Sequence, residues 1–175
     1  MTMEPINLYD YEARAKMVLP HNEWDTIDAG AMDMFTTRRN RSAFEALTLR
    51  PRFLRDTTKR DISTTVLGEE ISLPVMISPA GSHMKAHPDG ELATARGAGM
   101  SNTMMMLSTS SNYSMEEVSE AATGPLWFQQ YFFKDRELTL EMAHRAEEAG
   151  YTALCLTLDA KIKPKRERNI RNDYV

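Results

Sequence analysis

The sequence is poor in cysteine and contains no long apolar run. Cys155 is the only cysteine among 175 residues, which excludes an internal disulfide and fits a reducing compartment. No apolar run approaches the roughly 20 residues that a membrane-spanning helix needs. The first residues, MTMEPINLYDYEARAK, lack the basic and apolar regions of a secretory signal. We therefore expect a cytoplasmic protein with no membrane segment in this part.

The chain also lacks an excess of positive charge. Its formal net charge is −4, which argues against general nucleic-acid binding. Apolar residues make up 42% and charged residues 26%, the balance of an ordinary globular domain. Methionine is frequent, with 13 copies, three of them consecutive at Met104–Met106. Adaptable core filling explains these methionines more simply than a metal-binding cluster does, and we expect no metal site.

Four short apolar runs, each ending in small or polar residues, divide the second part of the chain. The runs are LPVMISPAG (73–81), TMMMLSTSS (103–111), PLWFQQY (125–131) and ALCLTLDA (153–160). Stretches with helical periodicity separate them. Strands that alternate with helices predict a parallel sheet buried on both faces, with polar groups at the strands' carboxyl ends. The pattern favours an α/β fold of the TIM-barrel type, in which that edge holds the active site.

Residues 1–72 precede the first run and are interpreted as an N-terminal helical cap and hairpin, and residues 73–175 as the first half of a (β/α)8 barrel. The spacing of apolar residues predicts a helix that starts near Leu8 and stops before Pro20. A second helix is expected from Asp28 to about Leu47. The stretch TTVLGEEISLP alternates around Gly68, which predicts a hairpin.

Local signals also place the helices between the runs. Pro88 is expected near the first turn of the helix after the first run. Ser114 and Glu117 have the spacing of a capping box. Gly150 is expected to end the next helix in a left-handed conformation. One face of that helix is predicted to carry Leu138, Met142, Ala146 and Ala149.

Four strands are half of what a closed barrel needs. A free-standing half would leave two strand edges and one sheet face uncovered. A second polypeptide or a second copy of this chain could complete the structure, or the chain could be a fragment of a longer enzyme. We favour the fragment, because half barrels seldom persist alone.

The block PVMISPAGSHMKAHPDGELATARGAG resembles the FMN-dependent 2-hydroxy acid oxidoreductases, the family of glycolate oxidase, lactate oxidase and mandelate dehydrogenase. Other similar blocks are DAGAMDMFTTRRNRSAFEALTLRPRFLRD, LSTSSNYSMEEV, WFQQYFFKDR and LTLDAKIKPKRERNIRN. Several dispersed motifs in the same order make this resemblance specific. It implies FMN as cofactor, an FMN-binding TIM barrel, and oxidation of an (S)-2-hydroxy acid, such as lactate or glycolate, to the 2-oxo acid.

The resemblance implies a set of flavin contacts at successive strand ends. The turn of Pro79, Ala80 and Gly81 would place backbone against the flavin, where a bulky side chain would displace the ring. Ser108, Gln129 and Thr157 match the family's polar contacts after the next three strands. An amide suits a flavin edge that alternates N–H and C=O groups, since it offers both a donor and an acceptor.

The resemblance also implies three residues that serve the substrate. Tyr131 matches the tyrosine that hydrogen-bonds the substrate and stabilises developing charge. Asp159 matches the aspartate that orients the catalytic histidine. Arg166 matches the arginine that binds the substrate carboxylate. Its neighbours Lys165 and Arg168 are expected to be solvated charges.

The histidine that acts as the family's catalytic base belongs to the second half of the barrel. None of the four histidines here is assigned that role, so we expect no turnover by this polypeptide alone. Two alternatives to the oxidoreductase remain open at this point. One is a non-catalytic, truncated homologue that acts as a binding or assembly partner. The other is a different FMN- or phosphate-binding barrel, such as an isomerase.

Overall fold

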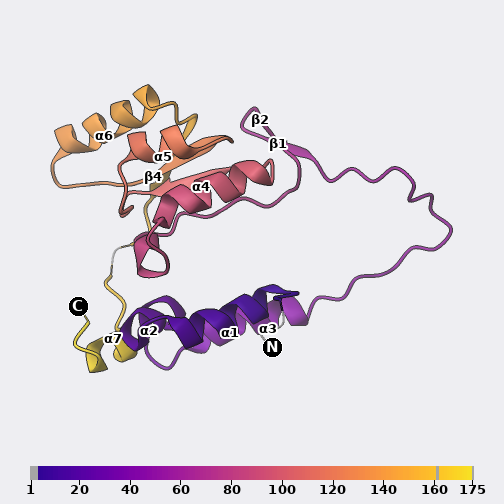
Figure 1. Cartoon of the computed structure of the whole chain (residues 1–175), viewed down its shortest axis with the longest axis horizontal. Helices are drawn as coiled ribbons and strands as arrows, with labels where there is room; N and C mark the ends of the chain where they lie inside the picture. Colours follow the sequence, from indigo (N-terminus) through magenta and orange to yellow (C-terminus); the bar gives the residue numbers. More distant parts are fainter. Residues whose placement is uncertain (1–3, 161, 175) are drawn as a thin grey trace. The chain divides into compact units, whose positions relative to one another are not determined.

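The computed structural model describes residues 4–160 and 162–174. The chain divides into two compact units, each described here by itself (Figure 1). The helical unit combines residues up to Asp56 with residues from Ile162 onward, and the sheet unit comprises Thr57–Lys161. This division differs from the predicted boundary at residues 72 and 73. The hairpin groups with the sheet, with which it shares apolar contacts, and the C-terminal tail groups with the N-terminal helices.

Among its described residues, the helical unit contains the helices α1 (Leu8–Val18), α2 (His21–Asp28), α3 (Phe35–Glu45) and α7 (Glu167–Arg171). The first helix is confirmed, and the Asn7 side chain caps it by accepting a hydrogen bond from the Asp10 backbone N–H at 3.0 Å. The helix predicted from Asp28 to about Leu47 is present as α3 but begins only at Phe35, and a separate helix, α2, ends at Asp28. Met32 and Met34 adopt left-handed φ angles of 49° and 61°, which interrupt the helical hydrogen-bond ladder between α2 and α3.

A polar network, more than an apolar core, joins α7 to α2. Of the residues described in these helices, only Trp24 and Asp25 are buried. The Asp25 carboxylate accepts hydrogen bonds from Arg168 Nη1 at 3.4 Å and Asn172 Nδ2 at 2.9 Å. Arg168 also binds Asp28 at 2.6 Å. The expectation that Arg168 is a solvated charge is therefore wrong: it ties together segments that lie about 140 residues apart in the sequence.

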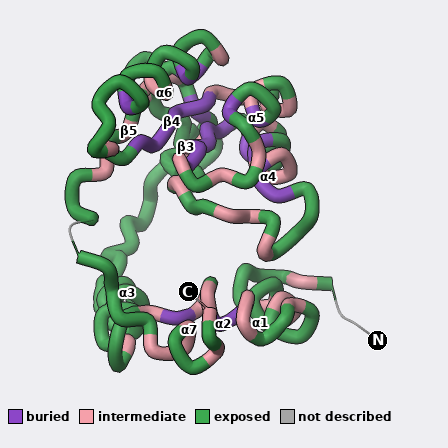
Figure 2. Tube along the Cα trace, turned by 90° about the vertical axis from the view of Figure 1, so that its left-hand side faces the viewer, coloured by how far each residue is buried: buried purple, intermediate pink, exposed green. Residues whose placement is uncertain are grey.

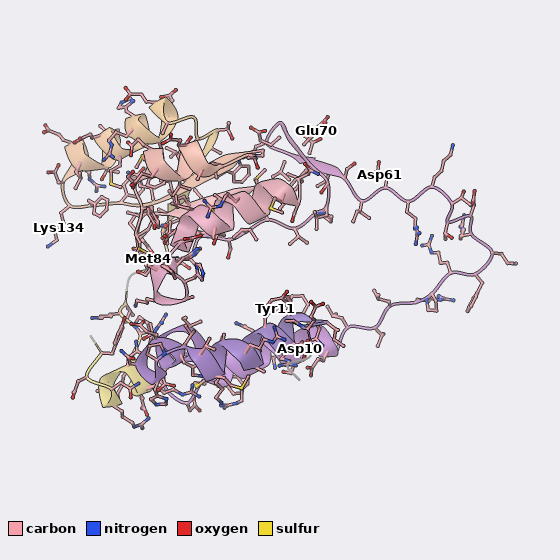
Figure 3. All side chains as sticks on the ribbon, viewed as in Figure 1. Asp10, Tyr11, Asp61, Glu70, Met84 and Lys134 are labelled. Carbon is pink, nitrogen blue, oxygen red and sulfur yellow. The ribbon has the colours of Figure 1, made fainter. Side chains whose placement is uncertain are left out.

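Residues 47–63, between α3 and β1, form neither helix nor strand, and their side chains are exposed (Figure 3). Asp61 lies in this segment. Hydrogen bonds from the Ser63 side chain and backbone N–H lower the pKa of its carboxyl group. Within 4–160 and 162–174, none of the helices combines the length and the apolar character required to cross a lipid bilayer.

The sheet unit alternates parallel strands with helices. Strands β3 (Met105–Ser108), β4 (Leu126–Tyr131) and β5 (Ala153–Thr157) pair in that order and run parallel. Helices α4 (Gly90–Met100), α5 (Met115–Ala121) and α6 (Arg136–Glu148) accompany them, and a short 3-10 turn, η1, covers His83–Lys85. This alternation confirms the predicted α/β class. The predicted hairpin is also present, with β1 (Thr64–Val66) antiparallel to β2 (Glu69–Ile71).

The first apolar run, residues 73–81, does not form the predicted strand. Ile77 alone makes a bridge to β3: its N–H donates to Met104 O at 3.0 Å, and its carbonyl accepts from Met106 N at 2.9 Å. Pro74 and Pro79 flank this bridge. Neither can donate a backbone hydrogen bond, so the ladder does not extend along the run.

Alternation along the strands separates two apolar clusters on the two faces of the sheet. The helix-covered cluster is built around Phe128, which is 1% exposed, and Val118, which is fully buried. On the opposite face, Trp127 packs with Met104 near the strands' amino ends, and Ile71 of the hairpin covers them. Figure 2 shows the buried positions concentrated along β3 and β4. The hairpin thus closes the end of the sheet that is opposite to the predicted site.

The helix ends follow the local signals closely. The capping box forms, because Glu117 N donates to Ser114 Oγ at 3.2 Å and Ser114 N to Glu117 Oε2 at 2.8 Å. Gly150 has a φ of +89° directly after α6, as predicted. Pro88 lies one residue before the cap of α4 and not in its first turn. Leu138, predicted to share one face of this helix with Ala146, is 41% exposed, whereas Ala146 is fully buried.

Replacing Tyr151 with phenylalanine should change how stability depends on pH. The Tyr151 hydroxyl donates to Met115 O at 2.9 Å, and burial, with a smaller effect of the Glu116 carboxylate, raises the pKa of this phenol. The folded state thus favours the protonated phenol. Its contribution is complete below the unfolded pKa of about 10 and is lost as pH rises above that value. Tyr151→Phe should cost about 1 kcal/mol at neutral pH and flatten the decline in alkali.

Urea unfolding at pH values from 7 to 11 measures this effect. Tyr113→Phe is the matched control, since the Tyr113 hydroxyl also donates to a backbone carbonyl, that of Pro88, but the ring is only partly buried. Parallel stability curves for the wild type and Tyr151→Phe across the alkaline range would contradict the prediction.

Candidate functional site at the carboxyl ends of the strands

Three of the predicted site residues form one hydrogen-bonded row, called here the strand-end row: Ser108, Gln129 and Thr157. Ser108 ends β3 and pairs in register with Gln129 of β4, and Thr157 ends β5. The Ser108 hydroxyl donates to Gln129 Oε1 at 3.2 Å, and Gln129 Nε2 donates to Thr157 Oγ1 at 2.8 Å. Strands separated by more than 20 residues thus bring these three polar side chains to one edge of the sheet.

The amide of Gln129 is the centre of the row. Its side chain is 2% exposed, and its Oε1 atom also accepts a hydrogen bond from the Thr109 backbone N–H at 3.2 Å. The oxygen therefore uses both lone pairs, and the nitrogen uses one of its two N–H groups. Within the described part of the chain, one amide N–H of Gln129 and the hydroxyl hydrogen of Thr157 have no acceptor and are left to donate to another group. The row presents hydrogen-bond donors, which match a ligand edge with carbonyl acceptors.

The turn of Pro79, Ala80 and Gly81 meets the loop that follows β3. Ser82 N donates to Ser110 O at 3.0 Å. A Cβ atom built on Gly81 would lie 2.7 Å from Ser110 Cβ, closer than real Cβ contacts, and 3.0 Å from Ser110 O, a tight contact. Glycine is thus required for the two loops to approach this closely. The turn that the sequence assigns to the flavin is therefore in direct contact with the loop after Ser108.

Tyr131 and Asp159 lie beyond the row along the same two strands. Tyr131 is two residues past Gln129, so both side chains project from the same face of β4. It pairs in register with Thr157 and is 37% exposed. Asp159 follows β5 by two residues and is exposed. An aromatic hydroxyl and a carboxylate thus follow the row on adjacent strands, while their catalytic roles stay predictions.

Arg166 belongs to the helical unit. It immediately precedes α7, and its Nη1 atom donates to the Thr26 carbonyl of α2 at 3.3 Å. The carbonyl of the neighbouring Lys165 accepts from Met32 N at 2.8 Å, and Lys165 Nζ lies 3.5 Å from Glu167. The segment that carries Arg166 is therefore held by the N-terminal helices. Its predicted function beside Tyr131 stays a prediction.

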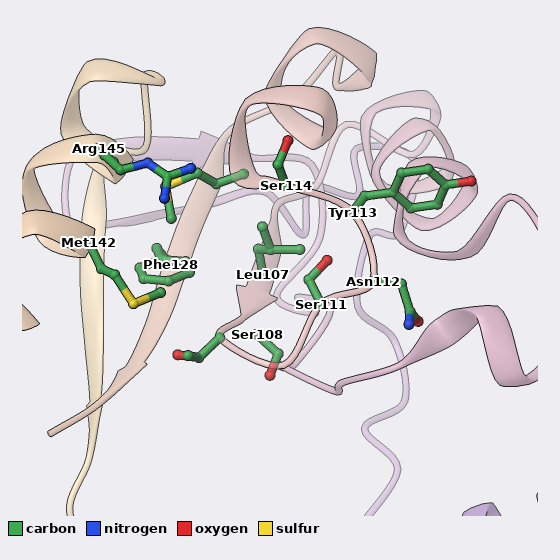
Figure 4. A pocket seen from close by; sticks show the side chains of 11 residues that line it. Leu107, Ser108, Ser111, Asn112, Tyr113, Ser114, Phe128, Met142 and Arg145 are labelled. Carbon is green, nitrogen blue, oxygen red and sulfur yellow. The ribbon is translucent and has the colours of Figure 1, made fainter. Parts of the chain in front are cut away.

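A pocket of about 240 Å³ opens beside the strand ends (Figure 4). Leu107 and Phe128, which line it, come from the helix-covered face, whereas the strand-end row lies on the other face. Arg145 at its rim is already paired with Glu116, with the closest approach at 2.9 Å. The pocket shares Ser108 with the row but is not the slot that the sequence predicts for a flavin.

Sequence reasoning missed two residues of this region. Thr109 donates its backbone N–H to Gln129, and its hydroxyl binds the Gln129 carbonyl at 2.5 Å. Its position among the polar residues that end the second apolar run, residues 103–111, could have indicated this role. Glu91 is fully buried in the first turn of α4, and no signal in the sequence distinguishes it from an exposed helix-start carboxylate.

Parallel strands that alternate with helices and gather polar side chains at their carboxyl ends define the first half of a (β/α) barrel enzyme. Residues 15–175 match the family described as FMN-dependent dehydrogenase, and the chain belongs to this family. FMN is the family's cofactor. The resemblance stated from the sequence motifs is thereby confirmed.

Known relatives support the same assignment. The chain is 45% identical over 172 residues to glycolate oxidase 3 of Arabidopsis thaliana, covering 98% of this chain and 47% of that protein. It is 45% identical over 175 residues to L-lactate oxidase of Nostoc sp., covering 98% and 48% respectively. The structure of a soluble mutant of (S)-mandelate dehydrogenase from Pseudomonas putida superposes with a TM-score of 0.94 at 35% identity, covering 98% of this chain and 49% of that one. The chain spans about half the length of these relatives, which fits an incomplete barrel.

Proposed function

We propose that this chain supplies the first half of an FMN site at which an (S)-2-hydroxy acid of the lactate or glycolate kind is oxidised to the 2-oxo acid. The observation that carries this proposal is the strand-end row, in which buried Ser108 and Gln129 and partly buried Thr157 are hydrogen-bonded in line with donors left unused. The family membership supports the cofactor, and the names of the relatives support the substrate class.

The residues present fit a flavin. The free N–H of Gln129 and the hydroxyl of Thr157 suit the carbonyl oxygens along the pyrimidine edge of an isoalloxazine ring. The missing side chain of Gly81 lets its turn contact the Ser110 loop, and we propose that the backbone of this turn borders the flat ring. When bound, FMN supplies a two-electron acceptor for the hydride equivalent that leaves the substrate.

The remaining site residues would act on the substrate. Tyr131 presents a phenol on the Gln129 side of β4, where it can donate to the substrate's oxygen atoms and stabilise charge that develops there. Arg166 carries a guanidinium whose planar fork suits the substrate carboxylate. Asp159 would hold a histidine, supplied by the second half, in the orientation and protonation state that proton removal requires.

The site is completed by a partner. On one face of β5, Leu154 and Leu156 are almost half exposed, and Leu158, directly after the strand, is 65% exposed. Apolar side chains in this pattern need a covering layer. We propose that the second half of a barrel covers them, either as a continuation of this polypeptide, as a separate chain or through self-association. We also propose a cytoplasmic location, in keeping with the single cysteine.

Reconstitution with a complementary half tests the proposal. The full 175-residue chain would be co-expressed with the second half of the Nostoc L-lactate oxidase, and the same half combined with its own first half is the positive control. We expect a yellow complex that bleaches when lactate or glycolate is added without oxygen. A colourless complex that retains no flavin, beside a yellow control, would overturn the proposal.

The uncovered face of β5 favours one alternative, a non-catalytic homologue that acts as an assembly partner. In that case the chain should join the complementary half, or an intact relative, as judged by gel filtration, without retaining flavin. Association and flavin retention are measured on the same sample, so the two functions are distinguished directly.

A further inference from the structure

Glu91 is a fully buried carboxylate outside the residues that the family resemblance assigns. It lies in the first turn of α4, behind the strand ends, and its exposed fraction is 0%. Its Oε1 atom accepts hydrogen bonds from the backbone N–H groups of His83 at 3.0 Å and Asn112 at 3.2 Å. Its Oε2 atom is buried and has no hydrogen-bond partner among the described residues. Burying a carboxylate costs free energy unless it is hydrogen-bonded. The two hydrogen bonds at Oε1 therefore indicate what this buried group does in the fold.

The two N–H groups belong to the two loops that contact each other at Gly81 and Ser110. His83 follows the Gly81 turn by two residues, and Asn112 lies in the loop that begins after Ser108. The loops are joined elsewhere as well. Met84 N donates to Asn112 Oδ1 at 3.0 Å, and the Tyr113 hydroxyl donates to Pro88 O at 3.0 Å. Glu91 contributes the side-chain oxygen that both loop backbones share.

Both loops therefore contact the same oxygen atom of α4, in addition to their direct hydrogen bonds to each other. The spacing of the two loops has little tolerance, since a single added Cβ at Gly81 would already collide with Ser110. A change of a few tenths of an ångström between the loops would move the Gly81 backbone relative to the strand-end row. A flat ligand bound between the Gly81 backbone and the strand-end row would then change its position as well.

We propose that Glu91 is a positioning residue that fixes the separation of these two loops and thereby sets the flavin slot. The part that concerns flavin rests on the function proposed above. Glu91 itself need not touch the cofactor. The proposal distinguishes the hydrogen-bond acceptor from the bulk of the side chain: glutamine keeps an acceptor oxygen at the same place, whereas alanine removes it.

Amide hydrogen exchange of the full chain tests the positioning directly and needs no cofactor. In Glu91→Ala we expect the amides of His83 and Asn112 to exchange at least 10-fold faster than in the wild type. The amides of Leu107 and Phe128, within β3 and β4, should change less than 3-fold, which separates loop release from general unfolding. Glu91→Gln should restore most of the protection. Unchanged loop amides in Glu91→Ala, or equal acceleration in loops and strands, would overturn the proposal.

Flavin titration of the reconstituted complex tests the consequence. We expect the FMN dissociation constant to rise at least 10-fold in Glu91→Ala and less than 3-fold in Glu91→Gln, with a shifted flavin absorption maximum in the alanine variant alone. A wild-type complex that binds no FMN refutes the proposed function, while the exchange pattern still decides whether Glu91 holds the loops. A wild-type complex that binds FMN no better than Glu91→Ala refutes the role of Glu91 in the slot.

Discussion

Replacing Gln129 with leucine is expected to raise the FMN dissociation constant of the reconstituted complex at least ~100-fold. The change removes the acceptor for Thr109 N and the Ser108 hydroxyl, and the donor to Thr157. Each buried group left unpaired costs roughly 1–3 kcal/mol. The free amide N–H that would meet the flavin is lost as well. Quenching of FMN fluorescence during titration gives the dissociation constant, and a urea transition gives the accompanying loss of stability.

Gln130→Leu is the matched control for this substitution. Gln130 is the next residue of β4, equally buried at 1% exposure, and its Nε2 atom donates to Thr139 O at 2.5 Å on the helix side of the sheet. Its loss should lower stability by a similar amount and leave the affinity for FMN within about 3-fold of the wild type, since it lies on the opposite face. Equal losses of affinity in the two variants would show that the row has no special relation to flavin.

Features that depend on neighbouring residues could be predicted from the sequence. The capping box at Ser114 and Glu117, the left-handed Gly150 and the hairpin around Gly68 each follow from local backbone and hydrogen-bond geometry. The alternation of strands and helices is also local, because it rests on the periods of apolar residues within single segments. These parts of the fold are confirmed.

Features that depend on distant residues could not be predicted in the same way. Arg168 is a plausible solvated charge until α2 brings Asp25 and Asp28 to it. The first apolar run has the composition of a strand, yet only Ile77 pairs, because proline on each side limits its hydrogen bonds. Leu138 has the correct helical spacing but remains exposed. For Arg168 a tertiary contact decides what the local pattern leaves open, whereas the prolines beside Ile77 are a local signal that the apolar composition of the run outweighed in the prediction.

The candidate site was predictable in part. The resemblance indicated Ser108, Gln129 and Thr157, and the rule that parallel strands end at one edge predicted that they would lie together. The sequence could not predict the strand register that sets Ser108 opposite Gln129. It also could not predict the hydrogen bonds that occupy the side-chain oxygen of Gln129. Those features decide which donors remain, and they follow only from paired strands.

A second substitution with a large expected effect lies in the helical unit. Its C-terminal helix, α7, is bound by the buried carboxylate of Asp25. Asp25 is 7% exposed and lies 3.2 Å from His21 Nε2, 3.4 Å from Arg168 Nη1 and 2.9 Å from Asn172 Nδ2. The buried apolar surface around it is small. Since α7 directly follows Arg166, the contacts of Asp25 also hold the segment that would bring this arginine to a substrate.

Asp25→Ala is therefore expected to release α7 from α2. Removing one member of a buried charged pair costs about 3–5 kcal/mol, and roughly 2–3 kcal/mol is expected here because Arg168 keeps Asp28 and is partly exposed. By the conversion of about 1.4 kcal/mol per factor of ten, amides of α7 should exchange roughly 30- to 150-fold faster. Glu45→Ala, which removes an exposed ion pair with Arg41 on α3, should leave exchange in α7 unchanged. If α7 stays as protected in Asp25→Ala as in the wild type, its other contacts, such as Arg168 with Asp28, hold the helix, and Arg166 does not depend on the Asp25 carboxylate for its position.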